Sequence, residues 1–276
     1  MSGRRAPLWK SLAVVFATVA ITVAFIVFAL LVGPEVQRLI VRAVVVVLVI
    51  FLILRFLRYF SLLWFSYLGH AERNVLGLRE LRELPPVSIL VPAYNEGRVM
   101  ERALTSLMRL DYPEYEVLVV DDGSTDDTLA IAAAWEGQHG PAHFRVITKP
   151  NGGKASALNA GIDHSTHPLI LCMDADSYLE PRALLDAARH FDDPNVGGVA
   201  GNVKVENRRT LIARLQALEY IEGLNMPRRA QGFIAAVNIV PGPVGLFRRE
   251  ELEEIGGYDE DTFAEVGDLT LKMLAA

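Results

Sequence analysis

The chain has 276 residues, 51% of them hydrophobic, and a formal net charge of -6. The negative charge argues against a nucleic-acid partner, which would require a basic face, and the hydrophobic content is high for a soluble protein. The single cysteine, Cys172, excludes an internal disulfide and fits a reducing compartment, and we predict that it is a small buried side chain on a strand.

Most of the apolar excess lies in the N-terminal quarter of the chain. Residues 12–32 carry no charge and are long enough to cross ~30 Å of hydrocarbon as a helix. A second apolar run, 39–57, is interrupted only by Arg42 and Arg55 near its ends, where long side chains can reach the interface. With a turn at 33–35 between them, the two runs predict a transmembrane hairpin.

A secretory signal peptide is an alternative for the first run, because Arg4, Arg5 and Lys10 precede it. The run is longer than the apolar core of a signal, and no small-residue cleavage site is present. A spanning helix therefore fits better.

Basic residues in the flanks predict the orientation of the hairpin. They lie before and after it, at Arg4, Arg5, Lys10, Arg58, Arg73, Arg79 and Arg82, whereas the turn holds Arg38 alone. Both ends are therefore expected in the cytosol, with the chain a multi-pass protein of the inner (plasma) membrane. The aromatic segment 59–68 is expected at the interface as part of an N-terminal membrane region, 1–70, and 71–86 is expected to be a linker to the C-terminal domain, 87–276.

After the linker, short β-branched runs alternate with helical segments, which is typical of an α/β protein with a parallel sheet. The predicted strands are 87–91, 116–120, 144–148 and 169–173. The predicted helices are 98–109, 126–135 and 155–162. In such sheets the loops after the strands line the ligand crevice, so 94–96, 121–125 and 174–177 should meet at one site.

Asp174 and Asp176 directly follow the last of these strands. Alternate residues at a strand end can aim two carboxylates at one hard cation, Mg²⁺ or Mn²⁺. Such a cation would neutralise charge on a departing nucleoside diphosphate. A D-x-D taken alone is also typical of an exposed acidic loop.

Two further segments each allow a structural and a binding interpretation. Residues 121–126 can form a turn with a helix cap, or place the carboxylate of Asp121 or Asp122 against a nucleobase or ribose. Residues 151–154 can be a plain turn, or a helix start at which backbone N–H groups and Lys154 meet phosphate.

Four segments, in this order and spacing, resemble glycosyltransferase family 2: V-S-I-L-V-P-A-Y-N-E, V-V-D-D-G-S-T-D, N-G-G-K-A-S-A-L-N-A-G and D-A-D-S. The hairpin, with 201–202, 219–220 and 245–249, further resembles the membrane-bound processive polysaccharide synthases of poly-N-acetylglucosamine, hyaluronan and cellulose. The resemblance covers Pro86 to the end. It implies a GT-A fold, Rossmann-like, with a mostly parallel sheet and helices on both faces, preceded by two transmembrane helices. It also implies inverting transfer from a UDP-sugar to a hydroxyl of a growing chain.

The resemblance assigns roles by position. The nucleotide-sugar site would comprise Ala93, Glu96, Asp121, Asp122, Lys154 and Asp174. Within it, Lys154 would approach the diphosphate, and Asp174 with Asp176 would organise the metal. The acceptor side would be lined by 201–205 and 241–245, including Gly201, Asn202, Pro241, Gly242 and Gly245.

The chain departs from the family's pattern near its C-terminus. The family has a Thr-Glu-Asp triplet whose aspartate is the general base, and here residues 264–266 read Ala-Glu-Val. Val266 therefore stands at the base position, which leaves Glu265 and Asp268 as candidate bases. The sequence stops at Ala276 inside an amphipathic pattern, so the domain is expected to be truncated.

Three functions are consistent with these features. The leading one is a transferase that extends a polysaccharide. A second is a single-transfer enzyme that makes a glycolipid, for which a bilayer anchor is equally useful. A third is a catalytically impaired subunit that binds a nucleotide sugar, suggested by Val266, with a membrane partner subunit.

Overall fold

The computed structural model describes residues 33–76, 84–234, 237, 240, 243–261 and 265–275, except for the side chains of 72–76, 265 and 266. The chain divides into two compact units, Met1–Ser61 and Leu62–Ala276. The first predicted membrane span, 12–32, lies outside the described residues.

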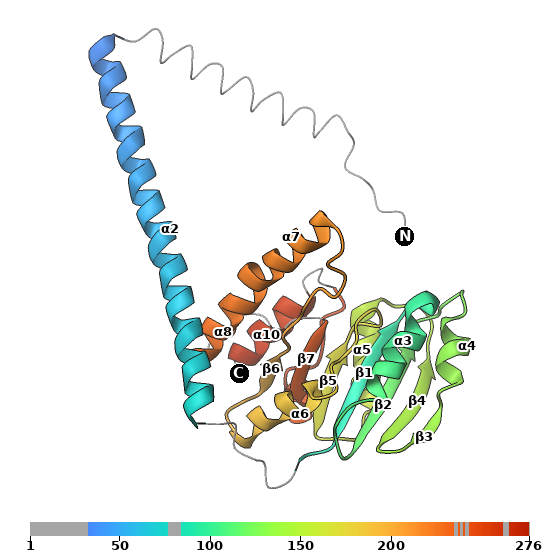
Figure 1. The fold of residues 1–276 in the computed structure, drawn as a ribbon. Coiled ribbons are helices and arrows are strands. Elements are labelled where there is room, and N and C mark those ends of the chain that lie inside the picture. Colours follow the sequence, from blue (N-terminus) through green and yellow to red (C-terminus); the bar gives the residue numbers. More distant parts are fainter. Residues whose placement is uncertain are drawn as a thin grey trace. The chain divides into compact units, whose positions relative to one another are not determined.

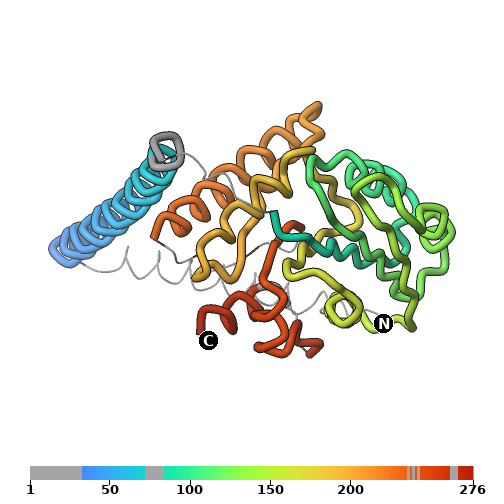
Figure 2. The backbone as a smooth tube through the Cα atoms, turned by 90° about the horizontal axis from the view of Figure 1, so that it is seen from below, coloured from blue at the N-terminus to red at the C-terminus, as the bar shows by residue number. Residues whose placement is uncertain are grey.

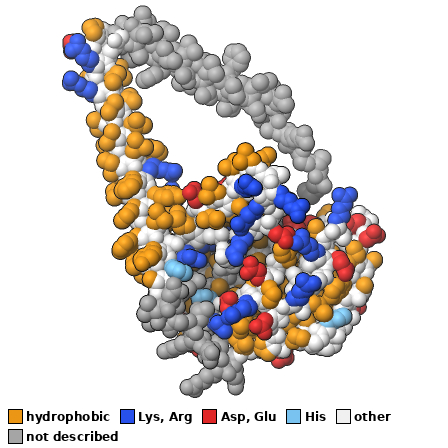
Figure 3. Space-filling view, in the orientation of Figure 1, with side chains coloured by type: hydrophobic (Ala, Val, Ile, Leu, Met, Phe, Trp, Pro, Cys, Tyr) orange, Lys and Arg blue, Asp and Glu red, His pale blue; other side chains and the backbone are white. Residues whose placement is uncertain are grey.

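Helix α2, Pro34–Leu76, begins the described part of the chain (Figure 1). Within its stretch Pro34–Ala71, an 18-residue window has a mean hydropathy of 2.9 and no buried residues. By length and composition this stretch can cross a membrane. Apolar side chains cover the helix in Figure 3. Among the described residues it is the one helix with this property. The predicted span 39–57 and the aromatic segment 59–68 both lie within this continuous helix.

The second unit is built on a mixed sheet of seven strands in the order β3-β4-β2-β1-β5-β7-β6. The strands are β1 (Val87–Ala93), β2 (Tyr115–Asp121), β3 (Gly137–His139), β4 (Ala142–Thr148), β5 (Leu169–Met173), β6 (Gly198–Ala200) and β7 (Val244–Arg248). The strands β4, β2, β1 and β5 are mutually parallel, whereas β3 and β7 run antiparallel to their neighbours and β6 is antiparallel to β7.

The four predicted strands are confirmed, with ends that differ by at most two residues. The expectation of a mostly parallel sheet needs correction at both edges, where β3, β6 and β7 make antiparallel pairs. Two of these three strands, β3 and β6, are three residues long, too short for a two-residue periodicity to mark them in a sequence.

Helices cover both faces of the sheet (Figures 1 and 2). They are α3 (Gly97–Leu107), α4 (Thr128–Ala133), α5 (Lys154–His164), α6 (Ala183–Ala188), a 3-10 turn (Arg189–Asp192), α7 (Leu211–Glu219), a π-helical turn (Tyr220–Asn225), α8 (Met226–Phe233), α9 (Arg249–Glu254) and α10 (Glu265–Ala275).

Alternation along the central strand separates two cores. Ile89 and Val91 of β1 join the cluster that contains Met100 of α3, whereas Leu90 faces the other side and joins Leu158 of α5. In Figure 2 the yellow-green α5 and the red α9 and α10 lie on the same side of the sheet, consistent with this second cluster. Because both faces are covered, β2 is buried along its whole length.

A buried carboxylate fastens the amino-terminal edge of the sheet. Glu116, with 3% of its surface exposed, accepts hydrogen bonds from Ser88 Oγ (2.5 Å), Thr166 N (2.7 Å) and Arg145 Nη1 (3.1 Å). Burial raises the pKa of the Glu116 carboxyl, but the hydrogen bonds from Ser88, Thr166 and Arg145 outweigh it and leave this pKa below its ordinary value.

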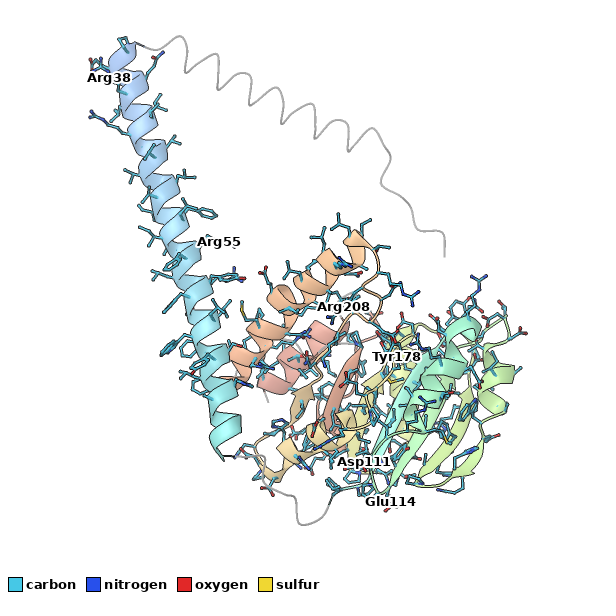
Figure 4. All side chains as sticks on the ribbon, in the orientation of Figure 1. Arg38, Arg55, Asp111, Glu114, Tyr178 and Arg208 are labelled. Atoms are coloured by element: carbon cyan, nitrogen blue, oxygen red, sulfur yellow. The ribbon has the colours of Figure 1, made fainter. Side chains whose placement is uncertain are left out.

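We expect Glu116→Gln to lower the free energy of unfolding by about 1–3 kcal/mol at neutral pH, the range for hydrogen bonds to a charged group. Because the folded-state pKa is depressed, the stabilisation is present above the unfolded pKa, about 4.3, and is lost as pH falls through the folded pKa. Thermal unfolding in detergent from pH 7 to pH 3 measures this. Glu114→Gln is the matched control, an exposed carboxylate at the same edge (Figure 4). If Glu116→Gln lowered the free energy of unfolding equally at every pH, the ionised Glu116 carboxylate would not be the source of the stabilisation.

Candidate functional site

The first loop of the site follows β1 and is held by the loop after β2. Asn95 has a φ of 57°, in the left-handed region. Its Oδ1 accepts from Thr125 N at 2.8 Å, and its own N–H donates to Ser124 Oγ at 3.0 Å. These bonds aim the neighbouring Tyr94 and Glu96 at the carboxyl edge of the sheet.

Asp126 braces the same two loops. Its carboxylate accepts from Gly97 N at 3.1 Å and from Thr128 N at 3.0 Å, next to the first turns of α3 and α4. The hydrogen bonds from Thr128 and Gly97 outweigh the opposing effect of desolvation and hold the pKa of Asp126 below its ordinary value. The turn predicted for 121–126 is present, but the Ser or Thr helix cap is not: the N-cap of α4 is Asp127, which makes no side-chain cap hydrogen bond.

Asp121 and Asp122 have separate environments. Asp121 is 1% exposed; its Oδ2 accepts from Ser124 N at 3.3 Å, while its Oδ1 has no hydrogen-bond partner among the described residues. Asp122 is 3% exposed and accepts from Lys149 Nζ (2.7 Å), Gly152 N (3.0 Å) and Gly153 N (2.8 Å). Asp122 therefore fixes the loop 149–153.

This geometry bears on the two interpretations of residues 151–154, a plain turn or a phosphate-binding helix start. The N–H groups of Gly152 and Gly153 donate to Asp122, so they are already engaged by a carboxylate. Gly153, with a φ of 90°, turns the chain into α5, whose first residue is Lys154. The ammonium of Lys154 pairs with Asp174 Oδ1 across the site. The backbone N–H groups of Gly152 and Gly153 are held by Asp122, so the Lys154 ammonium is the group in this loop that a phosphate could contact.

The loops enclose a cavity of about 450 Å³ at the carboxyl edge of β1 and β5. It is lined by Pro92, Ala93, Tyr94, Glu96, Asp122, Asn151, Gly153, Lys154, Ala157, Asp174, Ala175 and Asp176. The structure therefore brings together the predicted nucleotide-sugar and metal residues, with the exception of Asp121, which is buried behind the lining.

The cavity is rich in negative charge. Burial, and after it the carboxylates of Asp176, Asp126 and Asp174, raise the pKa of Glu96. Lys154 offsets only part of this charge, since its ammonium is paired with Asp174. A positively charged ligand group would relieve the repulsion among these carboxylates.

Two carboxylates of the lining fit a divalent cation. Asp174 and Asp176 supply oxygen donors, the ligand type that Mg²⁺ and Mn²⁺ prefer. Among the described residues no group of three or more acidic, histidine or cysteine side chains gathers to hold a metal by itself. This matches a Mg²⁺-type site, which typically uses one or two carboxylates and takes further oxygens from substrate phosphates.

The predicted acceptor-side residues that the structure describes, Gly201, Asn202 and Gly245, do not line this cavity. Gly201 N donates to Val244 O at 3.0 Å, and a Cβ at Gly201 would lie 2.6 Å from Val244 Cγ1, so glycine permits close packing there. Gly245 lies in β7, where a Cβ would meet the Phe247 ring at 2.9 Å. Asn202 is exposed. Pro241 and Gly242 lie outside the described residues.

The candidate bases lie at the start of α10. Asp268 is paired with Lys272 at 2.9 Å and does not line the cavity. The side chains of Glu265 and Val266 lie outside the described part of the structure. The roles assigned to these three residues therefore remain predictions.

Sequence reasoning gave no individual role to two residues that line the cavity, Tyr94 and Asn151, or to Asn159, which joins α5 to a distant segment. Tyr94 is 50% exposed. Asn159 exchanges two hydrogen bonds with the backbone of Tyr258, at 2.9 and 2.8 Å, and so joins α5 to the segment before α10. The position of Tyr94 and Asn151 beside motif residues was the available signal; the Asn159 contact spans 99 residues and left none.

Comparisons with known proteins agree with this geometry. The family model described as "Glycosyl transferase family 2" matches residues 88–256. A poly-beta-1,6-N-acetyl-D-glucosamine synthase of Staphylococcus epidermidis is 30% identical over 196 residues, which cover 70% of this chain and 47% of the relative. The chain thus spans about half the length of this curated relative.

Solved structures share the fold. The mannosyltransferase PcManGT from Pyrobaculum calidifontis, in complex with GDP-Man and Mn²⁺, superposes with a TM-score of 0.59 at 28% identity, covering 78% of this chain and 60% of that one. S. aureus TarS 1–349 in complex with UDP-GlcNAc gives a TM-score of 0.51 at 24% identity over 68% of this chain and 53% of the other, a likeness in fold alone.

Proposed function

The chain belongs to glycosyl transferase family 2 and has a GT-A-like α/β fold, and from this premise we propose that it transfers a sugar from a UDP-sugar, with inversion, to a hydroxyl of a growing polysaccharide at a membrane. The name of the Staphylococcus epidermidis relative makes UDP-N-acetylglucosamine the first donor to test. The catalytic domain would be cytosolic and the chain an inner-membrane protein.

One observation carries the proposal: a single cavity gathers Glu96, Asp122, Lys154, Asp174 and Asp176. Its volume of about 450 Å³ lies within the range of small-molecule sites. Tyr94 and Glu96 suit a nucleoside, because an exposed aromatic ring can stack on a base and a carboxylate can accept from its N–H. Lys154, with a cation held by Asp174 and Asp176, suits a diphosphate.

A divalent cation held by Asp174 and Asp176 would neutralise the charge that develops on the leaving UDP. Lys154 would exchange its bond to Asp174 for one to a phosphate oxygen, and so orient the leaving group. Glu96 and Asp122 would hold the uridine end still. The loop bonds of Asn95, described above, keep these groups in place before the donor binds, which limits reorganisation.

Inversion requires a base on the acceptor side of the sugar. Val266 cannot take a proton, and Asp268 is paired with Lys272. Slow transfer is therefore expected of this chain, with Glu265 as the remaining candidate in the first turn of α10.

The test is donor profiling with the membrane-embedded protein. UDP release would be measured for UDP-N-acetylglucosamine, UDP-glucose, UDP-galactose and UDP-glucuronate, with GDP-mannose as the comparison suggested by the PcManGT structure. A clear preference for one UDP-sugar supports the proposal. Release from GDP-mannose alone, or none from any donor together with no UDP binding, overturns it.

Product size separates the two enzymatic alternatives. Chains of increasing length from radiolabelled donor indicate a polymerising transferase, and a single lipid-soluble product indicates glycolipid synthesis. UDP-sugar binding without turnover would indicate the binding subunit that Val266 suggests.

Lys154→Met should change two affinities in opposite directions. Without nucleotide, Mn²⁺ should bind severalfold more tightly, because the ammonium no longer competes for Asp174. With Mn²⁺ present, UDP should bind more weakly by about 1 kcal/mol, or roughly fivefold, through loss of the phosphate contact. Electron paramagnetic resonance of free Mn²⁺ and calorimetry measure the two. Lys204→Met, which removes an exposed lysine paired with Glu180, is the control; parallel changes in both affinities would refute the exchange.

The predicted topology is tested by cysteine labelling in intact cells. Val36→Cys, at the start of α2, should react with a membrane-impermeant maleimide from outside. Glu136→Cys, exposed in the second unit, should react only after permeabilisation. The native Cys172 is 3% exposed and gives little background. Labelling of position 136 in intact cells would reverse the assignment.

A further inference from the structure

The N-terminal end of α7 presents an uncovered apolar face. Leu211, Ile212, Leu215 and Leu218 have 73%, 78%, 57% and 51% of their surfaces exposed. Figure 3 shows these apolar side chains gathered over the free end of α7. Single exposed leucines are common on soluble proteins, but a contiguous group marks an interaction surface.

Helical spacing places these side chains together. Leu211, Leu215 and Leu218 stand four and three residues apart and so share one face. Thr210 caps the helix by accepting from Ala213 N at 3.2 Å, which fixes this face at the very start of α7. Glu219 ends it.

Arginines adjoin the apolar face. A second cavity, of about 460 Å³, is lined by Arg102, Glu206, Asn207, Arg208 and Arg209, immediately before α7. Arg102 pairs with Glu206 at 2.5 Å, whereas neither Arg208 nor Arg209 pairs with a carboxylate of the described residues. In a chain of net charge -6 this is a local excess of positive charge. Figure 4 shows Arg208 above the carboxyl edge of the sheet, on the same side as Tyr178.

The loop that carries these arginines is fixed. Glu206 accepts from Tyr178 Oη as well as from Arg102, and Arg102 lies 4.4 Å from the centre of the Tyr178 ring. Lys204 pairs with Glu180 at 3.2 Å. The basic and apolar groups are therefore presented together from a braced segment.

We propose that the end of α7 and its arginine loop, residues 208–218, dock onto the surface of an anionic lipid bilayer. The leucines and Ile212 would enter the boundary between headgroups and acyl chains, and Arg208 and Arg209 would bind lipid phosphates. Apolar side chains flanked by arginine are the combination that such an interface favours.

A bilayer fits better than a protein partner on two observations. Arg208 and Arg209 have no carboxylate partner among the described residues, so the loop offers positive charge that is complementary to anionic headgroups. The chain also carries its own candidate span, α2, so a membrane would be at hand; in this respect the inference rests on the membrane association proposed above. Within the unit Leu62–Ala276, Phe233 at the end of α8 stacks on Phe65 of α2, with ring centres 5.9 Å apart.

The test measures the depth of a spin label in lipid nanodiscs that contain the full chain. Labels at Leu215→Cys and, as an exposed control on α4, Leu129→Cys are compared by their collision rates with O₂ and with a water-soluble nickel chelate. At Leu215→Cys the ratio of O₂ to nickel collisions should be at least about threefold that of the control, and higher with phosphatidylglycerol than with phosphatidylcholine alone. Arg208→Glu combined with Arg209→Glu should remove the lipid dependence, and Arg182→Glu should not.

Other outcomes overturn the proposal. Free access of nickel to position 215 in both lipids would show an undocked helix. Protection of the label at position 215 from both O₂ and nickel would show that a protein segment covers it. Dipolar broadening of its spectrum would show that a second copy of the chain covers it. A label at Val47→Cys in α2 tests the membrane anchor separately: if it reads as lipid-buried while position 215 reads as aqueous, only the docking inference fails.

Discussion

Asp176→Ala is expected to weaken Mn²⁺-dependent UDP binding about tenfold or more, equivalent to at least ~1.4 kcal/mol. Asp176 and Asp174 are the two cavity carboxylates spaced for one hard cation. With one of them gone, the site would keep a single acidic ligand, itself paired with Lys154. Turnover should fall further than binding, because the charge on the leaving UDP develops fully only in the transition state.

Calorimetric titration of UDP with and without Mn²⁺ separates the metal contribution from direct contacts. Asp163→Ala removes an exposed carboxylate from α5 and serves as the control. Identical Mn²⁺-dependent titrations of variant and wild type would exclude Asp176 from the metal site.

Val266→Asp is expected to raise UDP-sugar turnover by at least about tenfold. A positioned carboxylate that takes the proton of a sugar hydroxyl contributes about 10²–10⁴-fold. In an ideal helix of 3.6 residues per turn, neighbouring positions differ by about 100° around the axis and positions two apart by about 200°. A base at position 266 is therefore not expected to be replaced by one at 265 or 268. Asp268 is in addition paired with Lys272.

Val266→Asn is the matched control, since it has the same shape as aspartate but cannot accept the proton. Initial rates of UDP release by the membrane protein, compared across pH, give the measurement. Loss of activity in Glu265→Gln or Asp268→Asn, with no gain in Val266→Asp, would place the base on the affected residue. Robust wild-type turnover that none of the four changes affects would place it outside this turn.

The sequence alone was sufficient for the central sheet and for the position of the cavity. Strands β1, β2 and β5 are buried on both faces, so their apolar runs are continuous and visible in the sequence. The parallel strand β4 is only partly buried. Parallel strands end at one edge, so polar residues after β1, β2 and β5 had to meet there. The family motifs then named Ala93, Glu96, Lys154, Asp174 and Asp176 correctly as neighbours.

The tertiary structure decided which groups in that cavity are available. The motif alone cannot show that Gly152 and Gly153 donate to Asp122, or that Lys154 pairs with Asp174, because these bonds join residues 20 to 31 positions apart. Nor could it separate Asp122 in the lining from Asp121 behind it. Alternation along a strand sends neighbours to opposite sides, and only the packed loops fix which side is open.

Helix α2 and the segment from β6 to β7 show the same difference between what the sequence determines and what the fold decides. Composition by itself identified the membrane-compatible segment within α2, because length and hydropathy are local properties. The antiparallel strands β6 and β7 and the exposed face of α7 depended on contacts between distant segments. Exposure depends on what packs against a side chain, so the sequence does not show whether Leu211 and Ile212 are buried; the fold leaves both exposed.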